Sequence, residues 1–213
     1  MDNQIERYKR QIDIVSYNQL NIPIHIIGCG GIGSWTTLML AKMGCSNITI
    51  YDFDEVEDHN VSSQFFKESQ LGLLKTDALV ANVYEQTGIA PAISSVESEE
   101  EIQEGLVIIA VDSMAMRWKL NHFFKDKNIT IIDARMGGLQ AELYCVKAGD
   151  YEPTLVAIES VDHEICTAKA ISFNCGLISS LVANYVRLFV NNKLDFVRMK
   201  ERTFLFDTVT IIK

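Results

Sequence analysis

Residues 26–33, which read IIGCGGIG, decide the fold expected for this chain. They join a short apolar run, 23–28, to a segment of helical length, 32–43, that ends at a glycine. The glycines fit the pattern G-x-G-x-x-G at Gly28, Gly30 and Gly33. Glycines let the backbone approach a phosphate closely, and the N-terminus of a helix offers unpaired N–H groups and a positive dipole. The stretch therefore predicts a Rossmann-type nucleotide site.

The rest of the first 135 residues continues this alternation of strands and helices. Strands are expected at 47–51, 106–111 and 129–132, and helices at 74–86 and 115–126. Continuous apolar strands separated by helices are typical of a buried parallel sheet that carries helices on both faces. The predicted fold class is therefore α/β, with a Rossmann-like and mostly parallel sheet.

The pattern changes after Gly138. Residues 139–146 alternate between apolar and polar side chains, which is typical of a half-exposed antiparallel strand. A long helix is expected at 171–189, and residues 195–199 and 203–206 are expected to form a closing hairpin. We expect one domain over 1–213, with a nucleotide-binding part at about 20–135 and antiparallel strands, a crossover loop and a C-terminal helix at about 136–213.

Composition narrows the function classes. The formal net charge is −9 and no basic stripe is visible, which argues against nucleic acid or an anionic membrane surface as the main partner. No signal peptide or unbroken membrane span is evident. The 5 cysteines include no C-x-x-C pair, so free thiols in a reducing, cytoplasmic location are expected rather than disulfides.

An acidic residue follows the second expected strand. Asp52 stands nineteen residues after Gly33, where a carboxylate can accept hydrogen bonds from ribose hydroxyls. The glycine loop and this residue alone do not separate a nicotinamide dinucleotide from ATP.

Five further features appear in a fixed order and favour ATP. They are the N-terminal RYKRQ with Arg7 and Arg10, the doubled Gly30-Gly31, the DFDEV run with Asp52 and Asp54, the NVSSQ run with Asn60 and Gln64, and Lys75 followed later by Asp112. In this ordered set the chain resembles the ThiF/MoeB/HesA family, which has the fold of the ubiquitin-activating enzymes. The resemblance covers roughly residues 5–190.

The resemblance implies an ATP-dependent adenylyltransferase that activates the C-terminal carboxylate of a protein or peptide. Gly30, Gly31 and Gly33 would then cradle ATP, and Asp52 would hold the ribose. Lys75 would contact phosphate, and Asp112 would bind Mg²⁺. Arg10 would reach the ATP of a neighbouring subunit in a homodimer. The other residues implied to contact the nucleotide are Gly28, Asp54, Asn60, Gln64 and Arg117.

The chain departs from the family pattern at two places. The family usually reads N-x-x-R-Q, but Ser63 replaces the arginine here, so a positive charge is missing from the expected phosphate clamp. Lys67, Arg117 and Arg135 are candidate replacements. The two C-x-x-C pairs of many relatives are also missing, and since structural zinc needs four such ligands, we expect no zinc.

One cysteine is a candidate nucleophile. Cys166 lies in the polar segment 162–167, before the long helix, where some relatives carry a cysteine that bonds to the activated partner. A helix N-terminus lowers the pKa of a thiol, and His163 could assist. Cys45, Cys145 and Cys175 lie in apolar surroundings and are expected in the core.

Three functions remain open from the sequence. The leading one is adenylation of a ubiquitin-like or sulfur-carrier protein that ends in Gly-Gly, or of a peptide. A nicotinamide-dependent oxidoreductase would explain the glycine loop and Asp52 but not Arg10, Lys75 and Asp112. An inactive subunit of an activating complex would explain Ser63.

Overall fold

A computed structural model describes residues 3–95, 101–155, 169–194, 196, 201–205 and 210–212. Within these residues one sheet holds eight strands in the order β3-β2-β1-β4-β5-β6-β7-β8. Neighbouring strands from β3 to β5 are parallel, and those from β5 to β8 are antiparallel. The order 3-2-1-4-5-6 is that of a doubly wound Rossmann sheet. The predicted fold class is confirmed.

Every expected element of the nucleotide-binding part is present, with ends shifted by a few residues. The strands are β1 (Ile24–Ile27), β2 (Ile48–Tyr51), β3 (Ala92–Ile93), β4 (Glu104–Ile109), β5 (Asn128–Gly137), β6 (Gln140–Lys147), β7 (Glu201–Leu205) and β8 (Thr210–Ile212). The α-helices are α1 (Asn3–Tyr8), α2 (Gly31–Met43), α3 (Asp58–Val61), α4 (Lys75–Thr87), α5 (Met114–Phe124) and α6 (Ser172–Val190). Short 3₁₀ turns include η1 (Lys9–Gln11), η5 (Ala148–Asp150) and η6 (Glu152–Thr154).

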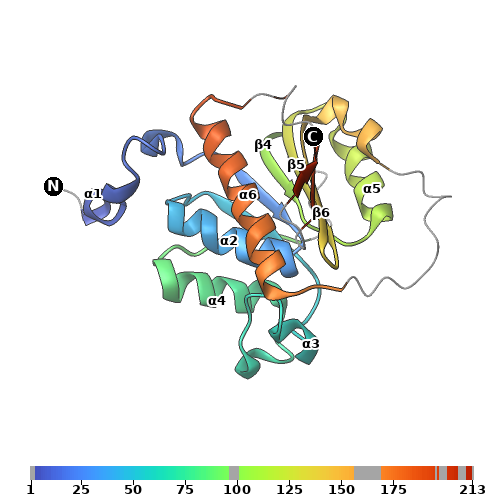
Figure 1. Cartoon of the computed structure of the whole chain (residues 1–213). Coiled ribbons are helices and arrows are strands. Elements are labelled where there is room, and N and C mark those ends of the chain that lie inside the picture. The colour runs from blue at the N-terminus through green and yellow to red at the C-terminus, as the bar shows by residue number, and fades with distance from the viewer. Residues whose placement is uncertain are drawn as a thin grey trace.

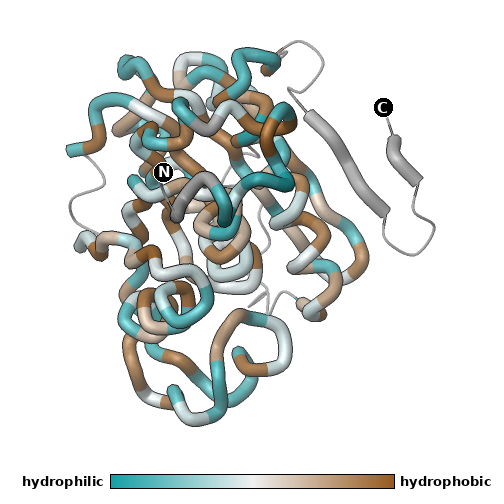
Figure 2. Tube along the Cα trace, turned by 90° about the vertical axis from the view of Figure 1, so that its left-hand side faces the viewer, coloured by the Kyte–Doolittle hydropathy of each residue, from teal (hydrophilic) through white to brown (hydrophobic). Residues whose placement is uncertain are grey.

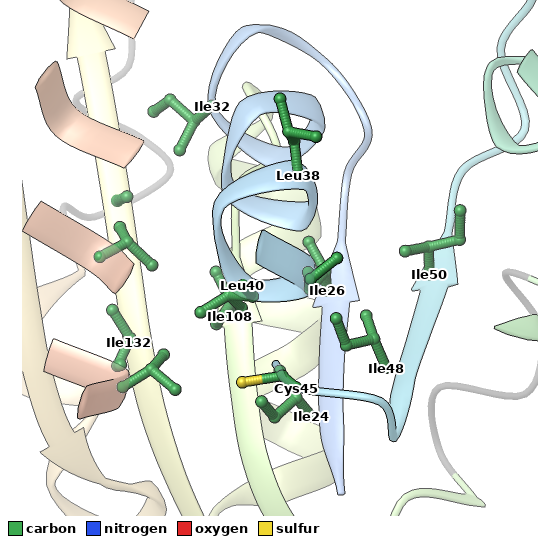
Figure 3. Close-up of a cluster of buried hydrophobic side chains, with 14 of the residues drawn as sticks. Ile24, Ile26, Ile32, Leu38, Leu40, Cys45, Ile48, Ile50, Ile108 and Ile132 are labelled. Atoms are coloured by element: carbon green, nitrogen blue, oxygen red, sulfur yellow. The ribbon is translucent and has the colours of Figure 1, made fainter. Parts of the chain in front are cut away.

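The parallel strands are apolar on both faces because helices cover both. Ile24 and Ile26 of β1 belong to one buried cluster with α2, α4 and α6, whereas Ile27 belongs to a second cluster with α5. Figure 3 shows the first cluster, which includes Leu40 of α2 and Ile108 of β4. Along the outer elements the tube in Figure 2 changes repeatedly between brown and teal, as expected for elements with one buried side.

Helix α6 covers the same face of the sheet as α2 and α4. It crosses α2 (Figure 1) and buries Ile178, Val182 and Val186 in the cluster below. The hydroxyl of Ser179 donates to the carbonyl oxygen of Ile32 at 2.8 Å and ties the two helices together. By length and composition α6 is the one helix in the described residues that could cross a membrane. Its packing on α2 buries Ile178, Val182 and Val186, whereas Phe173 and Leu177 at its start are exposed.

Two expectations about the second half are wrong. Strand β5 runs on to Gly137 instead of ending at 132, because Arg135 pairs with Glu142 in an antiparallel register with β6. Arg135 is therefore a strand residue. The first strand of the expected closing hairpin is also misplaced, since Phe196 is helical. The hairpin in the structure pairs β7 with β8, and residues 195, 197–200 and 206–209 lie outside the described part.

We predict that alanine at Gly33 destabilises the fold. A Cβ there would lie 1.8 Å from the carbonyl oxygen of Gly28, whereas a Cβ at Gly137 would meet no atom within 4 Å. Gly33→Ala should lower the free energy of unfolding by at least the ~1–3 kcal/mol that is typical of an overpacked core. Gly137→Ala should change it by less than about 0.5 kcal/mol, as surface substitutions do. Urea denaturation of both variants measures this, and equal midpoints would contradict it.

Candidate functional site

The loop that follows β1 turns sharply because two of its glycines have no room for a side chain. Gly28 has a φ of +95°, and a Cβ there would lie 2.7 Å from the carbonyl oxygen of Ala110 after β4. A Cβ on Gly33 would overlap the backbone of Gly28. The loop therefore lies between β1 and β4, where the chain order of the sheet reverses. In open α/β sheets this point, at the carboxyl ends of the strands, is the usual place for a ligand.

The other two glycines of the loop have different neighbours. A Cβ on Gly31 would lie 2.9 Å from Sγ of Cys175, so Gly31 is needed for the packing of α6. A Cβ on Gly30 would meet only the far end of Gln64, with Nε2 at 4.0 Å. Gly30 precedes the first residue of α2 and supplies no side-chain cap. The first N–H groups of α2 thus keep their capacity to bind an anion next to open space at Gly30.

Asp52 connects the glycine loop to the end of β2. One carboxylate oxygen, Oδ2, accepts the backbone N–H of Cys29 at 2.6 Å, and the other, Oδ1, accepts the N–H of Asp54 at 2.8 Å. Burial raises the pKa of Asp52, and the two backbone hydrogen bonds oppose that rise. Each carboxylate oxygen has a second lone pair and so can still accept a ribose hydroxyl.

Lys75 lies next to this unit. Its Nζ is 2.7 Å from Oδ2 of Asp54, and the side chain of Lys75 is 9% exposed while that of Asp54 is 50% exposed. The backbone N–H of Lys75 also donates to the carbonyl oxygen of Asp54 at 2.8 Å. The structure therefore brings together four predicted site features: the glycine loop, Asp52, Asp54 and Lys75.

The NVSSQ run, 60–64, packs against the first turns of α2. The side chain of Asn60 accepts the N–H of Glu57 at 2.9 Å and closes a capping box on α3. The indole of Trp35 donates to the carbonyl oxygen of Ser63 at 3.0 Å. Oε1 of Gln64 is buried and has no hydrogen-bond partner among the described residues. This run places Gln64 beside Gly30, with an unused acceptor.

Ser63 itself is buried, with 7% of its surface exposed. The three cations suggested as replacements for the missing arginine all have other partners. Lys67 forms an ion pair with Glu85 of α4, and Arg117 and Arg135 both pair with Asp133. Among the described residues, Lys75 is the cation held next to the loop's Asp52–Asp54 unit.

Asp112 lies three residues after the end of β4, and it is exposed. It does not cap α5, because the hydroxyl of Ser113 accepts the N–H of Met116 at 3.3 Å and fills that role. Its carboxylate thus remains available at the carboxyl end of the sheet, and carboxylate oxygens are the ligands that Mg²⁺ prefers. Asp112 fits the predicted Mg²⁺ role by its chemistry and its exposure.

Arg10 lies far from the glycine loop of its own chain. It belongs to η1, where the next residue, Gln11, donates a hydrogen bond to the carbonyl oxygen of Met43 at the end of α2. Helix α2 has 13 residues, which corresponds to about 20 Å. Arg7 donates to the carbonyl oxygen of Thr87 at 2.7 Å. Neither arginine touches the loop within one chain.

The described cysteines are all core residues, as expected for Cys45, Cys145 and Cys175. Cys29 is buried as well. Burial raises the pKa of Cys45 and of Cys145 to about 12 and that of Cys175 to about 11. Such thiols stay protonated and unreactive near neutral pH. The candidate nucleophile Cys166 and its neighbour His163 lie outside the described residues.

Sequence reasoning missed one buried polar centre. Asp133 is fully buried at the carboxyl-terminal half of β5, and the hydroxyl of Tyr151 donates to its Oδ2 at 3.0 Å. An ionisable residue inside a mostly apolar strand, ITIIDA, was the available signal, because such a group needs buried partners.

Strand, glycine loop and helix, with an acidic residue at the end of the second strand, define a Rossmann-type nucleotide-binding protein. A model of the ThiF family matches residues 8–212. The chain belongs to the ThiF family.

Relatives and solved structures agree with this membership. The chain is 24% identical over 201 residues to ubiquitin-like modifier-activating enzyme 5 of Aedes aegypti, which covers 79% of this chain and 50% of the relative. It is 32% identical over 134 residues to adenylyltransferase and sulfurtransferase MOCS3 of Culex quinquefasciatus, covering 56% and 31%. The crystal structure of E. coli MccB with ATP superposes with a TM-score of 0.79 at 21% identity, over 97% of this chain and 69% of that one. The chain spans half or less of the length of these two curated relatives.

We predict that Gly30→Ala separates folding from ligand binding. A Cβ on Gly30 meets no atom closer than 4.0 Å, so the melting temperature should change little. The added methyl group would occupy the space where a phosphate approaches the backbone, so nucleotide affinity should fall at least tenfold. Calorimetric titration and thermal melting of the same sample measure both. Unchanged affinity would exclude Gly30 from the binding site.

Proposed function

We propose that this chain is an ATP-dependent adenylyltransferase that activates the C-terminal carboxylate of a partner. The partner would be a ubiquitin-like or sulfur-carrier protein that ends in Gly-Gly, or a peptide. The observation that carries the proposal is the connected unit of glycine loop, Asp52, Asp54 and Lys75 at the N-terminus of α2. Membership in the ThiF family and the names of its relatives support the reaction class.

In this reaction a carboxylate oxygen of the partner attacks the α-phosphorus of ATP. The bond from that phosphorus to the bridging oxygen breaks, and pyrophosphate leaves with the bonding electrons. Negative charge concentrates on the phosphates, so the first turn of α2 and the Lys75 ammonium would stabilise it. A bound Mg²⁺, held by Asp112, would neutralise phosphate charge.

Lys75 favours ATP over a nicotinamide dinucleotide. A buried ammonium beside the glycine loop matches the higher charge of a triphosphate, and hydride transfer needs no such group. Asp54 keeps Lys75 oriented until a phosphate competes for the ammonium. The same residue argues against an inactive subunit, although Ser63 removes one cation from the family pattern.

Arg10 supports a homodimer in this proposal. The 13 residues of α2 separate it from the loop of its own chain, so it could contribute to a nucleotide site only across a subunit interface. Each glycine loop of the homodimer would then receive an arginine from the other subunit, because the Arg10 of its own chain lies too far away.

We predict that Lys75→Ala weakens ATP binding at least tenfold, because one charge-assisted contact to phosphate contributes about 1.5–3 kcal/mol. The matched control is Lys67→Ala, since the ammonium of Lys67 pairs with the exposed Glu85 instead of with Asp54. Titration calorimetry with ATP and Mg²⁺, run beside NAD on the same sample, should show binding of ATP alone. Binding of NAD alone, or equal affinity of the two variants, would contradict the proposal.

The activating step has its own test. With the correct partner, the protein should exchange labelled pyrophosphate into ATP, and the exchange should require a free C-terminal carboxylate. Candidate proteins ending in Gly-Gly, and short peptides, can be screened against versions with an amidated C-terminus. Exchange that survives amidation would contradict activation of that carboxylate.

A further inference from the structure

A buried polar centre lies outside the glycine loop, at Asp133 of β5, which pairs with the last residue of β4, Ile109. Asp133 is 0% exposed, and its two carboxylate oxygens contact different groups. Oδ1 accepts a hydrogen bond from Arg117 of α5, while Oδ2 accepts Nε of Arg135 at 2.8 Å and the hydroxyl of Tyr151 at 3.0 Å. A buried carboxylate needs such compensation, so these contacts fix the side chains around it.

The second terminal nitrogen of Arg117 contacts the backbone next to Asp112. NH2 donates to the carbonyl oxygen of Val111, and it is 3.5 Å from the carbonyl oxygen of Ala134. The side chain of Arg117 is 4% exposed, and the guanidinium is a rigid planar fork. One edge of the fork is therefore held by Asp133, and another holds the backbone just before Asp112.

The loop with Asp112 is fixed on its other side too. Ser113, the next residue, caps α5 through its hydroxyl. Asp112 thus lies between a carbonyl group held by Arg117 and a helix cap, and its own exposed carboxylate takes no part in either contact. Rotation and displacement of this loop are limited on both sides, while the carboxylate stays available.

We propose that Arg117, oriented by Asp133, is a positioning residue that holds the Asp112 loop in the geometry needed for Mg²⁺ with ATP. The expected effect on Mg²⁺ binding rests on the proposed function, in which Asp112 holds Mg²⁺ together with ATP. It replaces the sequence-based expectation that Arg117 itself contacts ATP. Groups that orient metal ligands typically change metal affinity about 10–100-fold when they are removed.

The second oxygen of Asp133 provides a matched control. Tyr151→Phe removes one buried hydrogen bond from the same carboxylate and leaves the contact between Arg117 and Val111 in place. Arg117→Lys keeps a positive charge beside Asp133 but cannot hold both Asp133 and the Val111 carbonyl group. Asp133→Asn is a second test of the same arrangement.

The first measurement is hydrogen exchange of the full chain over 111–114, with the melting temperature of each variant recorded. Arg117→Lys and Asp133→Asn should accelerate exchange there at least tenfold relative to Tyr151→Phe. Equal exchange in all variants would overturn the positioning role. This readout needs neither ATP nor Mg²⁺.

The second measurement is ATP affinity in EDTA and over a range of Mg²⁺ concentrations. Arg117→Lys should leave the affinity in EDTA unchanged and reduce the gain from Mg²⁺ about 10–100-fold, and Tyr151→Phe should reduce neither. A loss of ATP affinity in EDTA would instead show that Arg117 contacts the nucleotide. Failure of the unmodified chain to bind ATP would count against the proposed function, and the exchange result would still decide the positioning role.

Discussion

The carboxylate of Asp52 is the group on which the site depends. By accepting the N–H groups of Cys29 and Asp54, it joins the glycine loop after β1 to the end of β2. Asp54 in turn forms an ion pair with Lys75, the first residue of α4. Asp52 therefore sets the relative position of the glycine loop, the end of β2 and the Lys75 ammonium. Burial opposes the charged form of Asp52 and raises its pKa, and the two N–H donors limit that rise.

The cations near the glycine loop and those near β5 differ in how exposed their carboxylate partners are. Near the loop, Lys75 shares its charge with a half-exposed carboxylate, from which a phosphate can take it over. Near β5, Arg117 and Arg135 share a fully buried Asp133. Burial by itself would lower the pKa of Arg135, but Asp133 together with Tyr144 and Tyr151 raises it above its ordinary value. The buried arginines are therefore held in internal ion pairs with Asp133, whereas Lys75 can exchange its partner Asp54 for a ligand.

The sequence predicts the parallel half of the fold well, because apolar strands, the glycine loop and the helix-ending Gly44 are local signals. It also predicts Asp52 and Lys75 as neighbours of the loop through the family resemblance. The sequence does not predict where β5 ends, because residues 133–137 are held in the strand by antiparallel pairing with β6. It also misses Asp133 and its contacts with Arg117 and Tyr151, because pairs sixteen and eighteen residues apart are set by packing across the sheet.

The most direct test of this account is a crystal structure with Mg²⁺ and a non-hydrolysable ATP analogue. The account predicts that the phosphates lie on the first turn of α2 beside Gly30, with Lys75 turned from Asp54 toward them. It also predicts the ribose hydroxyls on Asp52 and the metal ion on Asp112. An analogue bound elsewhere, or one that leaves the Lys75–Asp54 pair intact and Asp112 without metal, would contradict it.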